Sequence, residues 1–357
     1  MSKKSEIRKI WRECFPADSP QWCRMFFDAA YVDDEALTVC DPETGAVVSS
    51  LLLLPYSMTF HGANLGLAYV YGAGTLRRYR ARGFMSQLMR EAIAEAADRG
   101  DTFTALIPAT EPLRLYYRRF GFSTVFFDRP QRYTSLHRFP VEGRYEAVDP
   151  ASPALFGVFE RLMAERPCCV QHTRAQFLTL MDDARLSGHG FAAVAPADGG
   201  DPVAMAWGVP DDFGSELCVR ELLAVDADAA RAALTELQRQ LPGRTLTLMT
   251  QPADSAIGGN LRAGGMLRVV NAASALAAVA AANPDLKLRL RLRDDLLPDN
   301  SGVYTLAGGR LTVGRDIGAV NLDLTPAVLA SMLFSSAPIA AITGLPGVRP
   351  RMSLMLD

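Results

Sequence analysis

The sequence predicts a mixed α/β (α+β) protein with three domains, and three observations lead to this prediction. The chain has 357 residues, more than the roughly 100–200 of a typical single domain. Helical and strand-like patterns alternate over about the first 140 residues. The pattern restarts near Val141 and changes in character near Met266. We therefore expect domains at residues 1–140, 141–265 and 266–357.

The first domain is expected to alternate helices with strands. Ile7, Ile10 and Trp11 recur at helical spacing, and Ser19-Pro20 is typical of the start of a second helix. A longer helix with one apolar face runs from Gly83 to Gly100. The remaining elements are strands at Ala36 to Cys40, Ala46 to Leu54, Leu65 to Gly74, Thr102 to Pro108 and Phe122 to Phe127, and a short helix at Leu113 to Arg119.

The second domain loosely repeats this order. Its predicted helices are Ala154 to Glu165, Arg174 to Ala184 and Ala227 to Gln240. Its predicted strands are Gly190 to Ala195, Pro202 to Gly208, Glu216 to Ala224 and Thr245 to Thr250.

The third domain has a different pattern. Leucine and a charged residue alternate strictly from Leu286 to Arg293, which predicts a strand with one buried face. A hairpin is expected around Gly308-Gly309, between Val303 to Leu306 and Arg310 to Val313. Apolar helices are expected at Ala272 to Ala282 and Thr325 to Phe334.

Composition excludes several classes of protein. Hydrophobic residues make up 49% of the chain, which excludes disorder over most of its length. The 37 basic and 39 acidic side chains leave a net charge of −2, which argues against a dedicated nucleic-acid binder. The longest apolar stretches are shorter than the ~20 residues that span a bilayer, so we expect no membrane association. Because no apolar signal core follows Met1, we expect a cytoplasmic location.

Cysteine, histidine and arginine need care before any of them is given a role. The six cysteines and four histidines show neither C-x-x-C nor H-x-x-x-H spacing, so we expect reduced cysteines and no metal. Four of the 37 basic residues are lysines, so 33 are arginines. Arginine is thus preferred throughout the chain, and only the spacing of an arginine is informative.

One segment, Ala68 to Ser86, carries the pattern of an anion site. A strand enters a turn rich in arginine and glycine and passes directly into a helix. The first turn of a helix has unpaired N–H groups and the positive end of the helix dipole, and glycine permits close approach to the backbone. A diphosphate fits this arrangement better than a carboxylate does.

Two motifs carry a resemblance to a known family. Arg80-x-Arg82-Gly83-x-Met85 resembles the pyrophosphate-binding signature Q/R-x-x-G-x-G/A of the Gcn5-related N-acetyltransferases (GNAT). Met85 departs from the generic pattern, and the Eis-type branch (enhanced intracellular survival protein) tolerates a large apolar residue there. The segment from Leu115 to Phe122 resembles the family's Y-x-R/K-F/L-G-F/Y block, about 35 residues further on.

The resemblance covers the whole chain and implies an architecture. Eis-type proteins are similar in having a GNAT domain, a second GNAT-like domain without the cofactor motif, and a sterol-carrier-like C-terminal domain. The family also implies a homo-oligomer, for which a hexamer is plausible. Its expected partners are small-molecule amines, with no nucleic acid and no membrane.

The resemblance also implies an activity: an acetyl-CoA-dependent N-acetyltransferase acting on a primary amine, with an aminoglycoside- or polyamine-like acceptor. Tyr117 aligns with the general acid of Eis-type enzymes, and the terminal carboxylate of Asp357 would be the base. The residues expected to bind the cofactor are Ala73, Gly74, Thr75, Arg80, Ala81, Arg82, Gly83, Phe84, Met85 and Ser86.

The sequence also permits other functions for the chain and other roles for these residues. The chain could be a lipid or small-molecule carrier with an inactive GNAT domain. Tyr117 could be a packed aromatic residue, although Tyr116 is the better candidate for the core. Glu111 is more typical of a helix start than of a catalytic base. Acidic residues such as Asp28 and Asp33 could attract a cationic acceptor, but they are equally typical of helix ends and turns.

Overall fold

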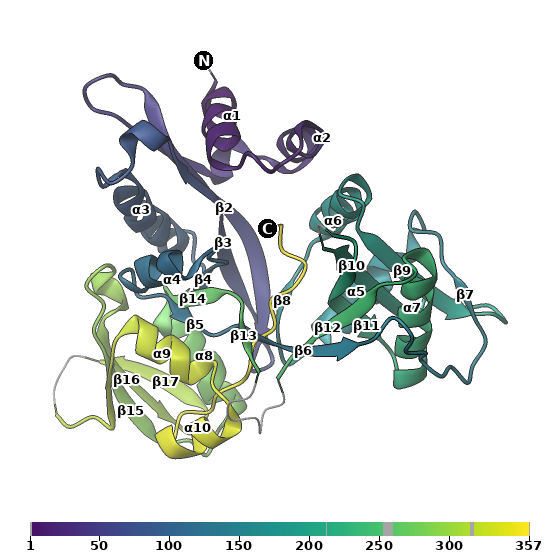
Figure 1. Ribbon diagram of the computed structural model, residues 1–357. Helices are drawn as coiled ribbons and strands as arrows, with labels where there is room; N and C mark the ends of the chain where they lie inside the picture. Colours follow the sequence, from purple (N-terminus) through teal and green to yellow (C-terminus); the bar gives the residue numbers. More distant parts are fainter. Residues whose placement is uncertain (1, 212, 253–259, 315–317, 357) are drawn as a thin grey trace.

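The computed structural model describes residues 2–211, 213–252, 260–314 and 318–356. Three β-sheets and the helices packed on them form the molecule, which confirms the mixed α/β class (Figure 1). No helix among the described residues is long and apolar enough to cross a membrane.

The first sheet is built mainly from the N-terminal third of the chain. In spatial order its strands are β1 (Ala36–Cys40), β2 (Val47–Phe60), β3 (Ala63–Thr75), β4 (Phe103–Leu106), β14 (Met266–Val269) and β5 (Ser123–Thr124), with β8 (Cys168–Gln171) paired to the far part of β2. β3 and β4 run parallel. The other neighbours along this order are antiparallel.

Helices cover both faces of this sheet because successive strand residues point to opposite sides. Ala68 and Val70 of β3 pack with α3 (Phe84–Asp98) and with Tyr117 of α4 (Glu111–Arg118). Tyr69 and Tyr71 face the other side, toward α1 (Lys3–Cys14), α2 (Pro20–Met25) and the π-helical turn η1 (Phe26–Ala30). The cofactor motifs and the N-terminal helices therefore lie on opposite faces.

Local sequence explains why the N-terminal helices begin where they do. The side chains of Ser2 and Ser19 accept hydrogen bonds from the amides of Ser5 and Trp22, as serine does at N-cap positions, and Pro20 follows at the first helical position. Trp22 then stacks on Trp11 at a ring distance of 6.0 Å. These contacts confirm the predicted helix start at Ser19-Pro20.

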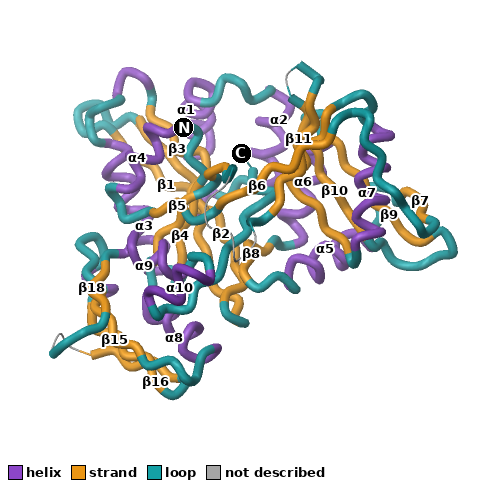
Figure 2. Tube along the Cα trace, turned by 60° about the horizontal axis from the view of Figure 1, so that its bottom comes forward, coloured by secondary structure: helices purple, strands orange, loops and turns teal. Residues whose placement is uncertain are grey.

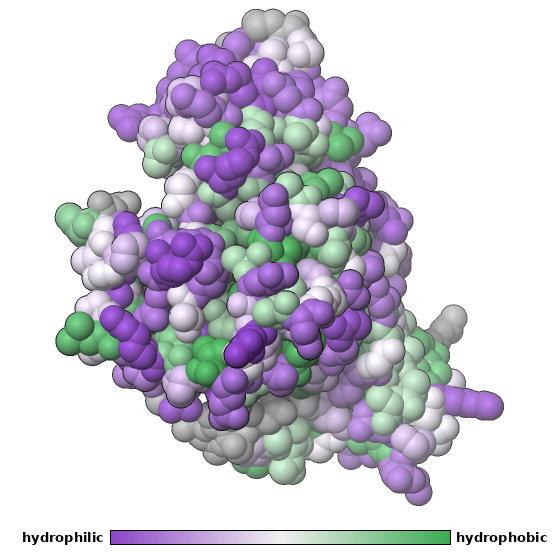
Figure 3. Space-filling view, turned by 90° about the vertical axis from the view of Figure 1, so that its right-hand side faces the viewer, coloured by the Kyte–Doolittle hydropathy of each residue, from purple (hydrophilic) through white to green (hydrophobic). Residues whose placement is uncertain are grey.

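The second sheet has its own core. Its spatial order is β13 (Arg262–Ala263), β6 (Phe127–Tyr133), β12 (Thr245–Thr250), β11 (Glu216–Ala224), β10 (Ala204–Pro210), β9 (Gly190–Pro196) and β7 (Tyr145–Ala147). α7 (Ala227–Gln240) packs on one face, and α5 (Ala154–Ala164) and α6 (Arg174–Leu186) pack on the other. Figure 3 shows the side of the molecule on which this sheet lies, where hydrophilic and apolar side chains are interspersed.

The third sheet is small and its core continues into the first. Its order is β17 (Arg310–Gly314), β16 (Gly302–Ala307), β15 (Leu288–Leu292) and β18 (Leu322–Leu324). α8 (Ala272–Ala282) and α9 (Pro326–Leu333) share its core, and α10 (Ala337–Thr343) contacts α9. The leucines of β15 are buried and its arginines are more exposed, as the alternation predicts. Phe334 contacts the rings of Phe60 and Phe103 in the first sheet.

Two strands cross the predicted domain ranges. β6, which lies within residues 1–140, belongs to the second sheet, where it pairs with β12. β14, which lies within residues 266–357, is inserted between β4 and β5 of the first sheet and runs antiparallel to both. Neither pairing has a local sequence signal, because strand partners more than 100 residues apart are chosen by tertiary packing. The three ranges stay a prediction.

The last described residues return to the middle of the molecule. In Figures 1 and 2 the last part of the chain passes between the first and second sheets. Arg351 forms a bridge to Cys169 of β8, and the chain continues from there toward Tyr69.

Candidate active site

The two parallel strands of the first sheet separate at their carboxyl ends. β3 pairs with β4 over Leu67–Tyr69 and 103–105, and then continues to Thr75 paired only with β2 on its other edge. A β-bulge follows the separation, because Gly72 and Ala73 both lie opposite Leu51 of β2. Gly72 has φ +57°, and a Cβ there would lie 2.2 Å from the Trp11 ring, so only glycine fits. The result is an opening between β3 and β4.

The turn after β3 ends in a helix start without a side-chain cap. Gly83 is the N-cap of α3 and lies at φ +89°, where its missing Cβ avoids strain. Ala81 has φ +61°. The backbone amides from Ala81 to Ser86 donate to no acceptor among the residues that the structure describes. A row of unpaired N–H groups at the positive end of a helix is the geometry that binds a phosphate.

The two signature arginines stabilise this turn from within. Arg80 Nε donates to the carbonyl of Thr75 at 3.0 Å. Arg82 pairs with buried Asp41 at 3.4 Å, and its guanidinium lies over the rings of Tyr79 and Phe84. Because both side chains already have partners within the protein, we expect a diphosphate to bind the backbone amides.

Met85 and Ser86 show how the first turn of α3 is attached to its surroundings. Met85, which replaces the small residue of the generic signature, is half-buried against the apolar cluster beneath α3. The Ser86 hydroxyl lies 3.1 Å from the hydroxyl of Tyr116 on α4. This bond joins the predicted cofactor turn to the helix that carries Tyr117.

Tyr117 is held in an apolar environment. Its side chain is buried and contacts the rings of Tyr116 and Phe122. Burial, with a smaller contribution from Tyr116, raises the pKa of Tyr117 to about 12. The hydroxyl is therefore protonated at neutral pH, as a proton donor must be. The expectation that Tyr116 is the more buried of the two was wrong, since Tyr116 is only half-buried.

The glycine of the second motif makes room for an arginine from β14. Gly121 has φ +79°, and a Cβ there would lie 2.1 Å from Arg268 Nη1. That nitrogen donates to the carbonyl of Phe120 at 2.6 Å. Nη2 of Arg268 binds both carboxylate oxygens of buried Asp294, at 2.6 and 2.7 Å. β14 and the third domain thus hold the end of α4, a support that the sequence motif does not reveal.

A cavity of about 290 Å³ lies between the first sheet, the second domain and the C-terminal segment. Its lining begins at Ile107 to Ala109, directly after β4, and reaches Trp207 of β10. Met352 to Met355 form one wall. Sequence reasoning missed this cavity, and neither Asp28 nor Asp33 lines it; Asp28 instead pairs with Arg8.

The C-terminal segment ends beside the point where β3 and β4 separate. The Tyr69 hydroxyl donates to the carbonyl of buried Leu356 at 3.4 Å, and Tyr69 is the last residue of β3 that pairs with β4. Asp357, the predicted base, lies outside the described residues. Among the described residues no cluster of histidine, cysteine, aspartate or glutamate could hold a metal ion.

The predicted site residues fall into two groups. Ala73, Gly74 and Thr75 lie at the end of β3, beyond its pairing with β4, and Arg80 to Ser86 form the turn and the first turn of α3. Tyr117 lies on the same face of the sheet, in the apolar cluster that also contains residues of α3. The structure brings these residues to one side of the opening.

Comparison with known proteins agrees with this geometry. Residues 2–125 match the model of the acetyltransferase (GNAT) domain. The match ends just before β6, where the chain enters the second sheet. No curated protein matches the sequence significantly.

Solved structures match the fold over nearly the whole chain. A Gcn5-related N-acetyltransferase from Anabaena variabilis has 17% identity and a TM-score of 0.76, covering 98% of this chain and 97% of its own. A probable N-acyltransferase from Enterococcus faecalis has 16% identity and a TM-score of 0.77, covering 99% and 97%. Eis1 from Mycobacterium abscessus has 17% identity and a TM-score of 0.73, covering 98% and 96%. The fold therefore resembles that of these proteins, Eis1 among them, over nearly the whole chain.

Proposed function

We propose that this chain, with its N-terminal GNAT domain, is an acetyl-CoA-dependent N-acetyltransferase that acetylates a primary amine. The observation that carries the proposal is the open gap between β3 and β4, bordered by the uncapped start of α3 and by Tyr117. The amides of Ala81 to Ser86 fit the diphosphate of acetyl-CoA. The cavity begins at Ile107, directly after β4.

The amine must lose a proton, the leaving thiolate must gain one, and the negative charge that develops on the thioester oxygen must be stabilised. The amine nitrogen attacks the thioester carbon, the C–S bond breaks, and the oxygen carries negative charge as this happens. We assign a backbone N–H near Ala73 as the donor to that oxygen, because the bulge removes this part of β3 from regular pairing. Tyr117 donates its proton to the leaving thiolate.

The base that receives the amine proton is assigned to a carboxylate at residue 357. Support comes from the position of Leu356, whose carbonyl is held by Tyr69 at the edge of the opening. In a chain that ends at Asp357, four appended alanines should lower kcat by about tenfold or more without lowering the melting temperature. Full activity of the extended chain would remove residue 357 from the mechanism.

The acceptor binds, in this proposal, in the cavity between the first and second domains. The cavity is reached from the end of β4, where the acetyl group would emerge, and one of its walls is the segment that precedes residue 357. An acceptor panel of aminoglycosides, polyamines and simple primary amines is the appropriate test of substrate class.

A carrier function has less support. The cofactor turn is intact, and the inward leucines of β15 are buried in a core that they share with α8 and α9. Two measurements separate the functions: calorimetric titration with acetyl-CoA, and thiol release from acetyl-CoA across the amine panel. An acetyltransferase binds acetyl-CoA and releases thiol only with an acceptor. Absence of acetyl-CoA binding would refute the proposal.

A further inference from the structure

The second sheet contains an opening like the one in the first. β11 and β12 pair in parallel from Glu216 to Val219 and from Thr245 to Leu248, and the pairing then stops. A bulge follows on β11, because Arg220 is an extra residue between the positions opposite Gly208 and Trp207 of β10. The two strands therefore separate at their carboxyl ends, as β3 and β4 do.

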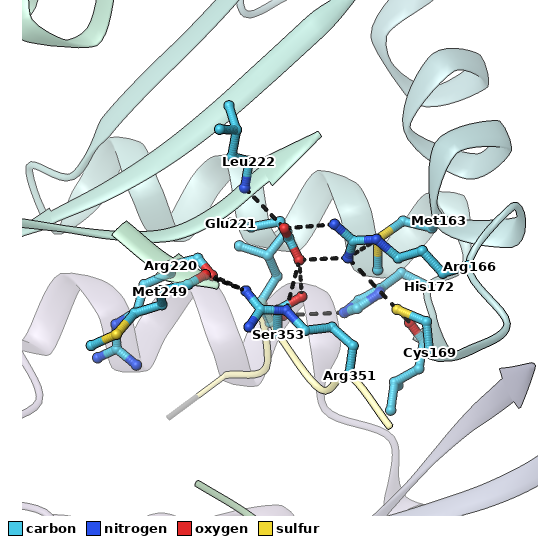
Figure 4. Close-up of polar contacts among 12 residues, drawn as sticks. Met163, Arg166, Cys169, His172, Arg220, Glu221, Leu222, Met249, Arg351 and Ser353 are labelled. Carbon is cyan, nitrogen blue, oxygen red and sulfur yellow. Dashed lines mark hydrogen bonds and ion pairs between the residues drawn. The ribbon is translucent and has the colours of Figure 1, made fainter. Parts of the chain in front are cut away.

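Arg351 fills this second opening. Its Nη2 donates to the carbonyl of Arg220 at 2.8 Å and to the carbonyl of Met249 at 3.1 Å (Figure 4). These are the first residues beyond the last paired positions on β11 and β12. The Arg351 side chain is almost fully buried. One guanidinium thus bridges the backbone of two strands that no longer bond to each other.

Two carboxylates balance the buried charge. Arg351 Nη1 donates to Asp128 at 2.5 Å, and Nε donates to Glu221 at 3.4 Å. Glu221 also accepts both Nη groups of Arg166 at 2.8 Å and the hydroxyl of Ser353. Burial acts to raise the pKa of Glu221, but the two guanidinium groups hold that pKa well below its usual value. Four of the five Arg351 N–H donors are used.

The main chain of Arg351 is hydrogen-bonded to β8. Its N–H donates to the carbonyl of Cys168 at 2.9 Å, and its carbonyl accepts from the amide of Val170 at 3.0 Å. Both residues belong to β8, which extends the first sheet. Five residues later the carbonyl of Leu356 reaches Tyr69. The segment therefore runs from the opening of the second sheet, which Arg351 fills, to the point in the first sheet where β3 and β4 separate.

We propose that Arg351 is a positioning residue for acetyl transfer. By filling the gap between β11 and β12 it fixes the segment that forms one wall of the acceptor cavity and carries residue 356 to Tyr69. This inference rests on the proposed N-acetyltransferase function. The cofactor turn of the first domain makes no contact with Arg351, so loss of the guanidinium should leave acetyl-CoA binding intact.

The test separates acceptor use from cofactor binding. Arg351→Met keeps the length of the side chain and leaves Glu221 paired with Arg166. We expect kcat/KM for the best amine of the panel to fall about tenfold or more, while the Kd for acetyl-CoA stays within about twofold of wild type. Added guanidinium chloride, at concentrations that do not unfold the protein, should restore part of the transfer rate. A general loss of structure would instead lower acetyl-CoA binding together with the transfer rate.

Two further variants control the result. Arg351→Lys keeps the charge but cannot reach two carbonyls and two carboxylates together, so it should remain impaired; it also replaces Arg351→Met if that variant does not fold. Arg310→Met, on exposed β17, should match wild type. Wild-type kcat/KM in both Arg351 variants, or acetyl-CoA binding that falls in step with transfer, would overturn the inference. Failure of the wild-type chain to bind acetyl-CoA would instead refute the proposed function.

Discussion

Two parallel strand pairs separate in this molecule, β3 from β4 and β11 from β12, and each separation is followed by a bulge. The first opening faces α3, whose N-cap is Gly83 and whose first amides are unpaired. The second precedes α7, which starts with a carboxylate cap: Asp226 accepts from the amide of Ala229 at 2.8 Å. In this second opening Arg351 bridges the two strands, β11 and β12.

The two regions differ at the start of the helix and in the gap between the strands, and these differences separate a predicted binding site from a closed structure. Asp228, in the first turn of α7, accepts the amides of Glu142 and Gly143, and these hydrogen bonds lower its pKa. A negative charge at a helix start repels a phosphate that the same backbone would otherwise attract. The two strand pairs separate in the same way, but the helix starts differ in backbone as well as in side chains: the N-cap Gly83 is left-handed and the N-cap Asp226 is extended.

The largest expected effect tests whether the first opening carries the chemistry. Tyr117→Phe should lower kcat by about 10²–10⁴-fold, because the leaving thiolate loses its proton donor. Acetyl-CoA affinity, measured by calorimetry, should stay near wild type. Tyr116→Phe is the matched control on the same helix and should change kcat by no more than about threefold. Unchanged turnover in Tyr117→Phe would show that Tyr117 is not the proton donor and that the first opening is not distinguished from the second by this residue.

The next effect concerns the closed region and its dependence on pH. His172 is buried beside Glu221 and donates from Nε2 to the carbonyl of Leu354 at 3.2 Å. Burial lowers the pKa of His172 to about 4, with the Leu354 carbonyl and Glu221 opposing the shift. The unfolded chain therefore binds this proton more readily, and the stability that neutral His172 contributes is lost as pH falls from about 6.5 toward 4.

The measurement compares wild type with His172→Gln, which keeps a neutral donor. The difference in free energy of unfolding between the two proteins should shrink or reverse in favour of the variant between pH 6.5 and 4.5. Glu221 is present in both proteins, so its own titration cancels from this difference. A difference that does not vary with pH would show that His172 is not buried in its neutral form.

The smallest expected effect transfers one feature of the second region to the first. Ser86→Asp places a carboxylate in the first turn of α3, as Asp228 does in α7. We expect the Kd for acetyl-CoA to rise about tenfold, while the helix gains roughly 0.3–1 kcal/mol of stability from its dipole. Ser86→Asn is the uncharged control of the same shape. If both variants bind alike, charge at the helix start is not what separates the regions.

Local elements could be predicted from the sequence because their signals are local. β11, α7, β12 and α8 occupy the predicted ranges, since alternation, helical periodicity and cap residues lie within each segment. The turn at Gly83 was predicted for the same reason. Tyr117 came from a resemblance rather than from its own environment, and its burial beside Phe122 is visible only in the structure.

The long-range parts of the site could not be predicted. Arg268 supports Phe120 from 148 positions away, and Arg351 reaches Arg220 across 131. In a chain this rich in arginine, nothing in the sequence distinguishes these two from the surface arginines of β15. The cavity likewise depends on how the second domain and the C-terminal segment meet the end of β4.

The insertion of β14 between β4 and β5 has a consequence for synthesis of the chain on the ribosome. β5 is complete at Thr124, but the strand that joins it to β4 ends only at Val269. At about 5–20 residues per second, the first sheet waits on the order of ten seconds with the edges of β4 and β5 unpaired. Unpaired strand edges recruit other chains. We therefore expect nascent chains halted between Thr124 and Val269 to bind chaperones, and this binding to end once residues beyond Val269 leave the ribosomal tunnel.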